Sequence, residues 1–192
     1  AAAGATNGSN FTTQPVVSIL DQDGNAVTTG TQSTQNVVVT SSSATLAGTT
    51  TVAGASGTGV ATFTNLKLTG TAGTITLTYT ISSPSTITNT QTISLVAGAP
   101  TQLVVTTGAN SCRSRIACLV QPVVKIADAS GNATTSTATV TATVTVGTGT
   151  VSAGSTAVAS AGIATFSGFT LQGTAGNFTV RYTIASPSIG VN

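Results

Sequence analysis

The chain has 192 residues, with five basic and three acidic side chains and no His, Met or Trp. It contains 43 Thr and 21 Ser, it lacks Glu, and charged residues make up 4% of it. Without imidazole and with so few carboxylates and thiols, the usual general bases, activated nucleophiles and metal sites cannot be assembled within one chain. This composition predicts a structural or binding protein without a cofactor, and not an enzyme.

The same composition limits the fold class. A hydrophobic fraction of 40% and a net charge of +2 lie far from the weakly hydrophobic, highly charged composition of disordered chains. Thr and Val are β-branched, and the 21 Gly and five Pro supply turns. We therefore predict an all-β protein.

The first motif along the chain, residues 14–25, contains a candidate cation site. Asp21, Asp23 and Asn25 place oxygen ligands at alternate positions, as at the start of a Ca²⁺ loop. Asp, Gly and Asn are also the residues that tight turns require. The matching residues 121–132 keep the turn residues but lose one carboxylate. We predict a turn without a bound metal, with calcium binding as the alternative.

Alternating apolar residues mark a strand in the last third of each half of the chain. In residues 74–81 and 177–184 every second side chain is apolar, which places one face in a core and the other in solvent. Further strands are predicted at residues 38–40, 61–68, 93–96, 101–107 and 138–146. The aromatic residues expected to anchor the cores are Phe63, Tyr79, Phe166 and Tyr182.

An internal repeat explains why the two halves carry the same signals. Residues 14–25 return at 121–132, an offset of 107, and residues 59–85 return at 162–188, an offset of 103, with 16 of 27 positions identical. This period far exceeds the roughly 20 to 50 residues of solenoid repeats, so each copy should be a domain of its own. We predict two tandem antiparallel β-sandwiches, residues 1–97 and 98–192.

Three motifs recur in the same order in both copies: Asp-x-x-Gly-Asn, Gly-(Val/Ile)-Ala-Thr-Phe and Gly-Thr-Ala-Gly-x-(Ile/Phe)-Thr-(Leu/Val). In this order they resemble the bacterial Ig-like domains found in tandem arrays of invasin- or intimin-type surface proteins. The resemblance covers nearly the whole chain, twice. It implies Ig-like folds, an extracellular location and a mechanical or adhesive role. Such domains also occur as parts of enzymes, so the motifs indicate fold more than function.

The alignment of the copies predicts one missing strand in each. Residue 1 matches residue 108, so the first copy has no counterpart of residues 101–107, and the second has none of residues 90–96. A sandwich that lacks a strand exposes a sheet edge and core residues until another strand fills the slot. Either the residues are part of a longer tandem chain, or neighbouring subunits complete one another by strand exchange into a filament.

Cys112 and Cys118 enclose a five-residue loop that contains Arg113 and Arg115. In a secreted Ig-like protein, such a pair is expected to form a disulfide that closes a hairpin, with two reduced thiols as the alternative. A metal site is not expected, because no His or further Cys can complete a tetrahedron. The two arginines are candidates for contact with an acidic partner or a glycan, or they serve only solubility.

The sequence also bears on glycans, nucleic acids and membranes as partners. Glycosylation sequons occur at Asn7, Asn10, Asn132 and Asn177, so attached glycans are a candidate modification. Nucleic-acid binding is not expected, because five dispersed cations and 4% aromatics give neither a phosphate-binding stripe nor a stacking platform. No apolar run approaches the roughly 20 residues that span a bilayer.

The sequence predicts a non-enzymatic structural subunit or repeat module of an extracellular, cell-surface filament or adhesin stalk. The alternative is an adhesive module that binds a glycan or a protein, although its loops are rich in Gly, Ser, Thr and Ala where such sites gather aromatic or charged residues. An accessory domain of a secreted polysaccharide-degrading enzyme is a third hypothesis, because the catalytic domain would then lie outside these residues.

Overall fold

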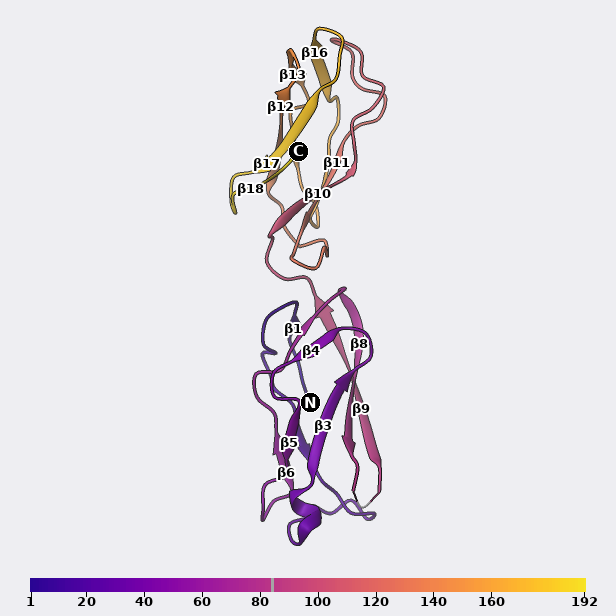
Figure 1. Cartoon of the computed structure of the whole chain (residues 1–192), viewed down its shortest axis with the longest axis vertical. Helices are drawn as coiled ribbons and strands as arrows, with labels where there is room; N and C mark the ends of the chain where they lie inside the picture. Colours follow the sequence, from indigo (N-terminus) through magenta and orange to yellow (C-terminus); the bar gives the residue numbers. More distant parts are fainter. Residues whose placement is uncertain (84) are drawn as a thin grey trace. The chain divides into compact units, whose positions relative to one another are not determined.

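The chain consists of β-strands and turns in the computed structural model, which describes residues 1–83 and 85–192. Within those ranges the one helical segment is the 3-10 turn η1 (Thr31–Thr34), and no α-helix is present. The predicted all-β class is confirmed. The chain divides into two compact units, unit 1 (Ala1–Val96) and unit 2 (Ala97–Asn192), whose strands are labelled in Figure 1.

Unit 1 contains one five-stranded sheet and two strand pairs. The sheet order is β1-β9-β8-β3-β5, with β1 parallel to β9 and the other neighbours antiparallel. The pairs β2–β6 and β4–β7 are antiparallel. The strands are β1 (Ala5–Thr6), β2 (Val16–Ser18), β3 (Asn36–Ser41), β4 (Thr45–Ala47), β5 (Thr51–Ala53), β6 (Val60–Thr62), β7 (Lys67–Thr69), β8 (Gly73–Ile81) and β9 (Ile87–Val96).

Alternation along β8 explains how unit 1 encloses its core. Ile75, Leu77 and Tyr79 are buried, whereas the threonines between them are more exposed, because successive side chains of a strand point to opposite faces. Phe63 is fully buried and meets the Tyr79 ring edge-on, at a centroid distance of 5.9 Å. The predicted stretch 61–68 contributes to two strands, β6 and β7, which belong to different strand pairs.

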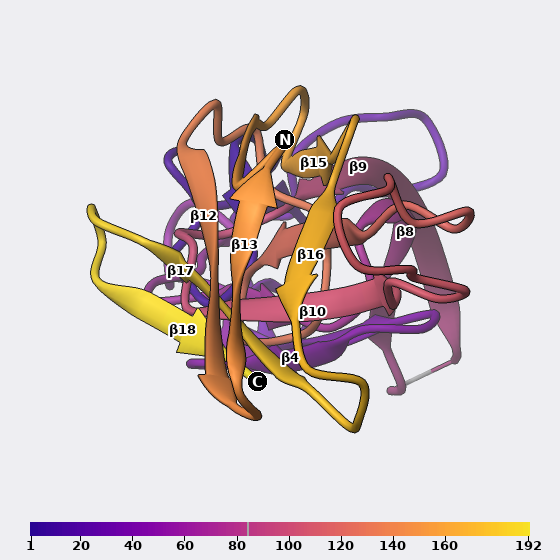
Figure 2. The ribbon, with the colours of Figure 1, turned by 90° about the horizontal axis from the view of Figure 1, so that it is seen from above.

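Unit 2 contains a three-stranded sheet, a four-stranded sheet and one strand pair, all antiparallel. The orders are β10-β11-β15, β14-β12-β17-β18 and β13-β16. Strand β13 lies between β12 and its partner β16 (Figure 2). The strands are β10 (Gln102–Thr107), β11 (Val123–Ala127), β12 (Thr139–Val146), β13 (Gly149–Ala153), β14 (Thr156–Val158), β15 (Ile163–Thr165), β16 (Thr170–Gly173), β17 (Thr179–Ile184) and β18 (Ile189–Val191).

The core of unit 2 is centred on aromatic rings at the repeated positions. The Phe166 ring meets Tyr182 edge-on, with centroids 5.5 Å apart, and it meets Phe169 in the same way at 6.1 Å. Phe166 and Tyr182 are offset by 103 from Phe63 and Tyr79, which form the equivalent contact in unit 1. Positions related by the repeat offsets of 107 and 103 are called counterparts below.

A glutamine side chain ties two loops together at the same place in both units. In unit 1 the Gln14 amide donates to the Leu66 carbonyl (3.1 Å) and accepts from the Leu66 backbone N–H (3.0 Å). In unit 2 its counterpart Gln121 accepts from the Phe169 N–H (2.7 Å) and donates to the Cys118 carbonyl (2.5 Å). The repeated Gln-Pro-Val-Val motif therefore begins with a side chain that satisfies loop backbone groups.

The length difference between the copies lies in one loop. Val39 of β3 faces Tyr79, and Ala142 of β12 faces Tyr182, so the offset is already 103 at this strand. The additional residues of unit 1 therefore fall before β3, in the segment that contains η1. In the part of the chain that the structure describes, no helix is long and apolar enough to cross a membrane.

Candidate functional site

The candidate cation site in unit 1 is a hydrogen-bonded turn, as predicted. Oδ1 of Asp21 accepts the backbone N–H groups of Asp23 (3.0 Å) and Asn25 (2.8 Å), and the Asn25 side-chain amide also donates to the carboxylate. The backbone N–H of Asn25 is the main reason that the pKa of Asp21 lies below its usual value. N–H donors therefore surround the carboxylate where a calcium ion would need oxygen ligands.

The counterpart turn in unit 2 has the same bonds in a different environment. Oδ1 of Asp128 accepts the N–H groups of Ser130 (2.9 Å) and Asn132 (3.0 Å). Asp128 is 1% exposed, whereas Asp21 is exposed to solvent. Its Oδ2 also accepts the Gly98 N–H at 2.8 Å. Within residues 1–83 and 85–192, no group of three or more His, Cys, Asp or Glu could hold a metal ion.

The two cysteines form the predicted disulfide. Cys112 and Cys118 are bonded, and the loop between them lies along β16, where the Arg115 N–H donates to the Leu171 carbonyl at 2.8 Å. Arg113 and Arg115 are exposed. Disulfides persist in oxidising compartments, so this bond indicates a location outside the reducing cytosol.

The four sequons differ in their surroundings. Asn7 is buried, and its Oδ1 accepts the Gly70 N–H at 2.9 Å. The side-chain amide of Asn132 donates to the Asp128 carboxylate. Asn10 and Asn177 are exposed. Because a glycan is attached through the side-chain amide nitrogen, the geometry favours Asn10 and Asn177 as acceptors.

Unit 1 has an open slot beside β2. In unit 2 the counterpart strand β11 lies between β15 and β10, but among the described residues β2 pairs with β6 alone. A cavity of about 270 Å³ lies beside it, lined by residues 17–21 and by Tyr79, Ile81 and the start of β9. Val16 and Leu20 are each 51% exposed, whereas Ala127, the counterpart of Leu20, is fully buried. We call this space the β2 slot.

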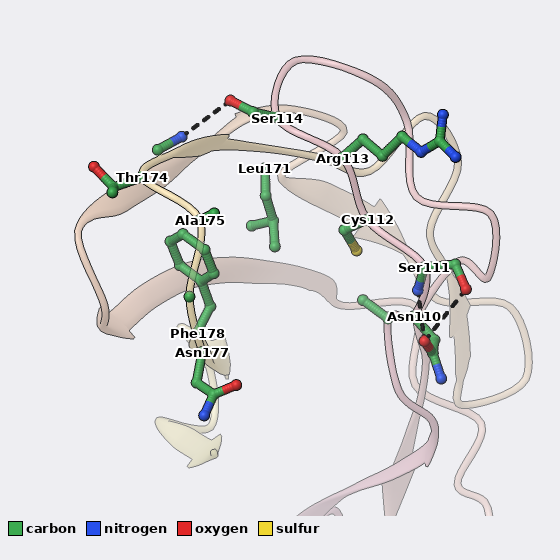
Figure 3. A pocket seen from close by; sticks show the side chains of 13 residues that line it. Asn110, Ser111, Cys112, Arg113, Ser114, Leu171, Thr174, Ala175, Asn177 and Phe178 are labelled. Carbon is green, nitrogen blue, oxygen red and sulfur yellow. Dashed lines mark hydrogen bonds between the residues drawn. The ribbon is translucent and has the colours of Figure 1, made fainter.

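Unit 2 has an open slot beside the segment that leads into β17. A cavity of about 640 Å³ lies between residues 109–114, before and within the disulfide loop, and Leu171 with residues 173–178. Leu171 and the ring of Phe178 project into it, and Cys112 lies on its other side (Figure 3). Phe178 and Val180 are half-buried, whereas their counterparts Ile75 and Leu77 are buried in unit 1. We call this space the β17 slot.

The sequence predicted the turns and the disulfide. It did not predict the hydrogen bonds that join segments far apart in the chain. Gly98, whose N–H binds Asp128, carried no signal, because this bond joins residues 30 positions apart. The loop-tying role of Gln14 and Gln121 was also missed. Their presence at the start of both repeated motifs was the available signal.

Comparisons with known proteins found little similarity. No protein-family model matches the chain, and no curated protein matches it. Among solved structures, the apo structure of Bacteroides uniformis beta-glucuronidase 3 aligns with 82% of this chain at 9% sequence identity and a TM-score of 0.34. This chain spans 20% of the length of that protein, and the TM-score is too low to assign a shared fold.

Proposed function

We propose that the chain is a non-enzymatic structural module of an extracellular, cell-surface filament or adhesin stalk, built from two tandem Ig-like β-sandwiches whose open edges are completed by neighbouring strands. One observation carries the proposal. The residues shared by the two units form framework contacts: the Phe–Tyr core pair, the Asp turn and the glutamine that ties the loops. A repeated framework is what a spacer requires.

The strand arrangement supports the Ig-like part of the proposal. In Ig-like sandwiches, the last two strands and the third strand share one sheet. Unit 1 has this arrangement in β9-β8-β3, and unit 2 has it in β18-β17-β12. The strands β2 and β6 form the opposite pair in unit 1, and their counterparts β11 and β15 pair in unit 2.

The chemistry of the surface supports a mechanical role. The charged fraction of 4% leaves few groups for recognition by ion pairs, and long antiparallel ladders such as β8–β9 join segments through many backbone hydrogen bonds. The disulfide supports an extracellular location, because such bonds persist where thiols are oxidised.

Antibodies against the chain, applied to intact cells of the source, test this proposal. Surface or fibre labelling that disappears after external protease treatment is the expected result. Labelling confined to the cytosol of permeabilised cells would contradict it. The mass of the labelled species after boiling with denaturant and reductant then separates the two forms of the proposal: 18.5 kDa plus any glycan indicates separate subunits, and a much larger mass indicates a tandem chain.

The alternative function, an adhesive module, is favoured by one observation. Arg113 and Arg115 are two of five cations, and both are exposed in a loop fixed by a disulfide. Selective and saturable binding on an array of anionic glycans, lost in the Arg113→Ala/Arg115→Ala variant, would support adhesion over a stalk role. Equal weak signals from both proteins across the array would leave the stalk proposal in place.

A further inference from the structure

We infer that the β17 slot is a binding site for one extended polypeptide strand with aliphatic side chains at alternate positions, seated antiparallel to β17 and to the segment that leads into it. The inference rests on the proposed function, because it names the kind of strand that would join one module to the next. Its occupant is a strand of the type of the second half of β9, contributed by a polypeptide segment outside the two described units.

In unit 1 the position equivalent to the β17 slot is occupied by the second half of β9. There, β9 runs antiparallel to β8, with Leu95 opposite Gly73 and Ile93 opposite Ile75. The other edge of β9 pairs in parallel with β1, where Ala5 faces Leu95. Ile93 and Leu95 are both buried in the core of unit 1. A strand at this position therefore has one neighbour on each side and two aliphatic side chains directed inward.

The counterparts of these neighbours line the β17 slot. Gly176 and Phe178 are the counterparts of Gly73 and Ile75, and Cys112 is the counterpart of Ala5. All three line the cavity of about 640 Å³ in unit 2. Among the described residues, β18 pairs with β17 only from Tyr182 to Ile184, so the edge before Tyr182 has no strand beside it on this side. The slot has the walls of the filled site and lacks the strand.

The register follows from the counterpart positions. An incoming strand would place one aliphatic residue opposite Phe178 and the next, two residues on, opposite Gly176. Backbone hydrogen bonds of an added strand supply affinity, and the pockets for alternate side chains supply specificity. Gly176 suits the second position because it leaves room there: a Cβ atom built on it meets nothing within 4 Å. A large side chain at residue 176 would occupy the position of the incoming residue.

The β2 slot is expected to fit a different type of strand. In unit 2 the space beside β11 is filled by β10, where Leu103 faces Ile126 and Val105 faces Val124. The counterparts of Ile126 and Val124 are Ile19 and Val17, which line the β2 slot. A strand of the β10 type therefore fits the β2 slot, and one of the β9 type fits the β17 slot. The two slots are expected to select between the two strands.

Peptide titration of the whole ¹⁵N-labelled chain tests the inference. A synthetic peptide with the sequence of residues 89–97 should shift the amide signals of residues 111–114 and 174–180 and leave those of residues 16–21 unchanged. A peptide of residues 100–108 should give the reverse pattern. A control peptide in which Ile93 and Leu95 are replaced by Thr should bind at least about tenfold more weakly.

Two variants at one position separate strand binding from general effects. Gly176→Trp should weaken binding of the 89–97 peptide at least about tenfold, whereas Gly176→Ala should keep it, and the unchanged amide dispersion of both variants checks their folding. The 100–108 peptide should bind both variants equally.

Two outcomes would overturn the inference. One is the absence of shifts in the β17 slot, and the other is equal binding of the Thr-substituted peptide. Each outcome is independent of the antibody labelling, so the strand inference and the proposed function can fail separately.

Discussion

The two units carry the same motifs, but each unit buries a different part of the repeat. At the Asp turn, unit 1 leaves Leu20 and Asp21 exposed, whereas unit 2 buries their counterparts Ala127 and Asp128 beside β10. At the strand that follows the Gly-Thr-Ala-Gly motif, the order reverses: Ile75 is buried in unit 1, and Phe178 is half-buried in unit 2. Burial at a repeated position therefore depends on the neighbouring strand as well as on the residue.

The strongest test of this comparison removes a contact that both units share. Phe63→Ala and Phe166→Ala should each destabilise their own unit by about 3–5 kcal/mol, because both rings are almost completely buried and truncation leaves a cavity. Urea unfolding monitored by NMR signals of each unit measures the two effects. If the two losses differ widely, the cores are not equivalent and the comparison fails.

The second prediction concerns the turn that the two units place differently. Asp128→Ala should cost about 2–3 kcal/mol, because three backbone N–H groups, those of Gly98, Ser130 and Asn132, lose a buried acceptor. Asp21→Ala should have a much smaller effect, because water can replace the carboxylate at an exposed turn. Denaturant unfolding of the two variants checks the difference. Equal losses would show that the presence of β10 beside the turn is irrelevant to it.

The third prediction concerns the covalent link that only unit 2 has. The Cys112→Ala/Cys118→Ala variant should lose about 2 kcal/mol of the free energy of unfolding, since the bond closes a short loop. The loss should be confined to unit 2, and the affinity of the β17 slot for the 89–97 peptide should fall, because Cys112 forms one wall of that slot. Thermal unfolding with and without reductant provides a second measurement. Loss of signals from unit 1 would contradict the assignment.

The smallest expected effect is on the pH dependence of stability. The pKa of Asp21 is lowered from 3.8 by hydrogen bonds, so its contribution is present above that value and is lost as the pH falls below it. Burial raises the pKa of Tyr79 and Tyr182 above 10.0, so their contribution is present below pH 10 and is lost as the pH rises further. The melting temperature should therefore be nearly constant from about pH 4 to pH 9.

Alkaline unfolding also compares the units directly. Tyr79 and Tyr182 are counterparts, and both are shifted for the same reason, so both units should lose stability in the same pH range. Phenylalanine at both positions should reduce the alkaline loss and leave the acidic loss unchanged. A large change in melting temperature between pH 5 and pH 8 would contradict this prediction.

Much of the fold was predictable because its signals are local. The alternation in residues 74–81 predicted β8, and the alternation in 177–184 predicted β17, which begins two residues later than expected. The position of β10 was predicted to within one residue. The stretch 61–68 was harder, because Asn65 has a positive φ of 60° and the chain passes from one strand pair to another around it. No periodic pattern marks such a change of partner.

The candidate sites divide in the same way. The Asp turn and the disulfide join residues four and six positions apart, so a short stretch of sequence is enough to predict each of them. The bonds of Gln121 with Phe169 and of Asp128 with Gly98 span 48 and 30 positions, so they depend on how the whole unit folds. The alignment of the copies predicted that each lacks a strand, but it gave no indication of the cavities beside β2 and before β17.

The sequence is enough to predict the all-β class, the repeated framework and the residues of each turn, because β-branched alternation and turn chemistry act over a few residues. The folded structure was needed to find which counterpart is buried, which sequon is exposed and where a strand slot lies open. These properties depend on which distant segment lies alongside a strand, since burial and hydrogen bonding at a sheet edge are set by the neighbouring strand and not by the edge residues alone.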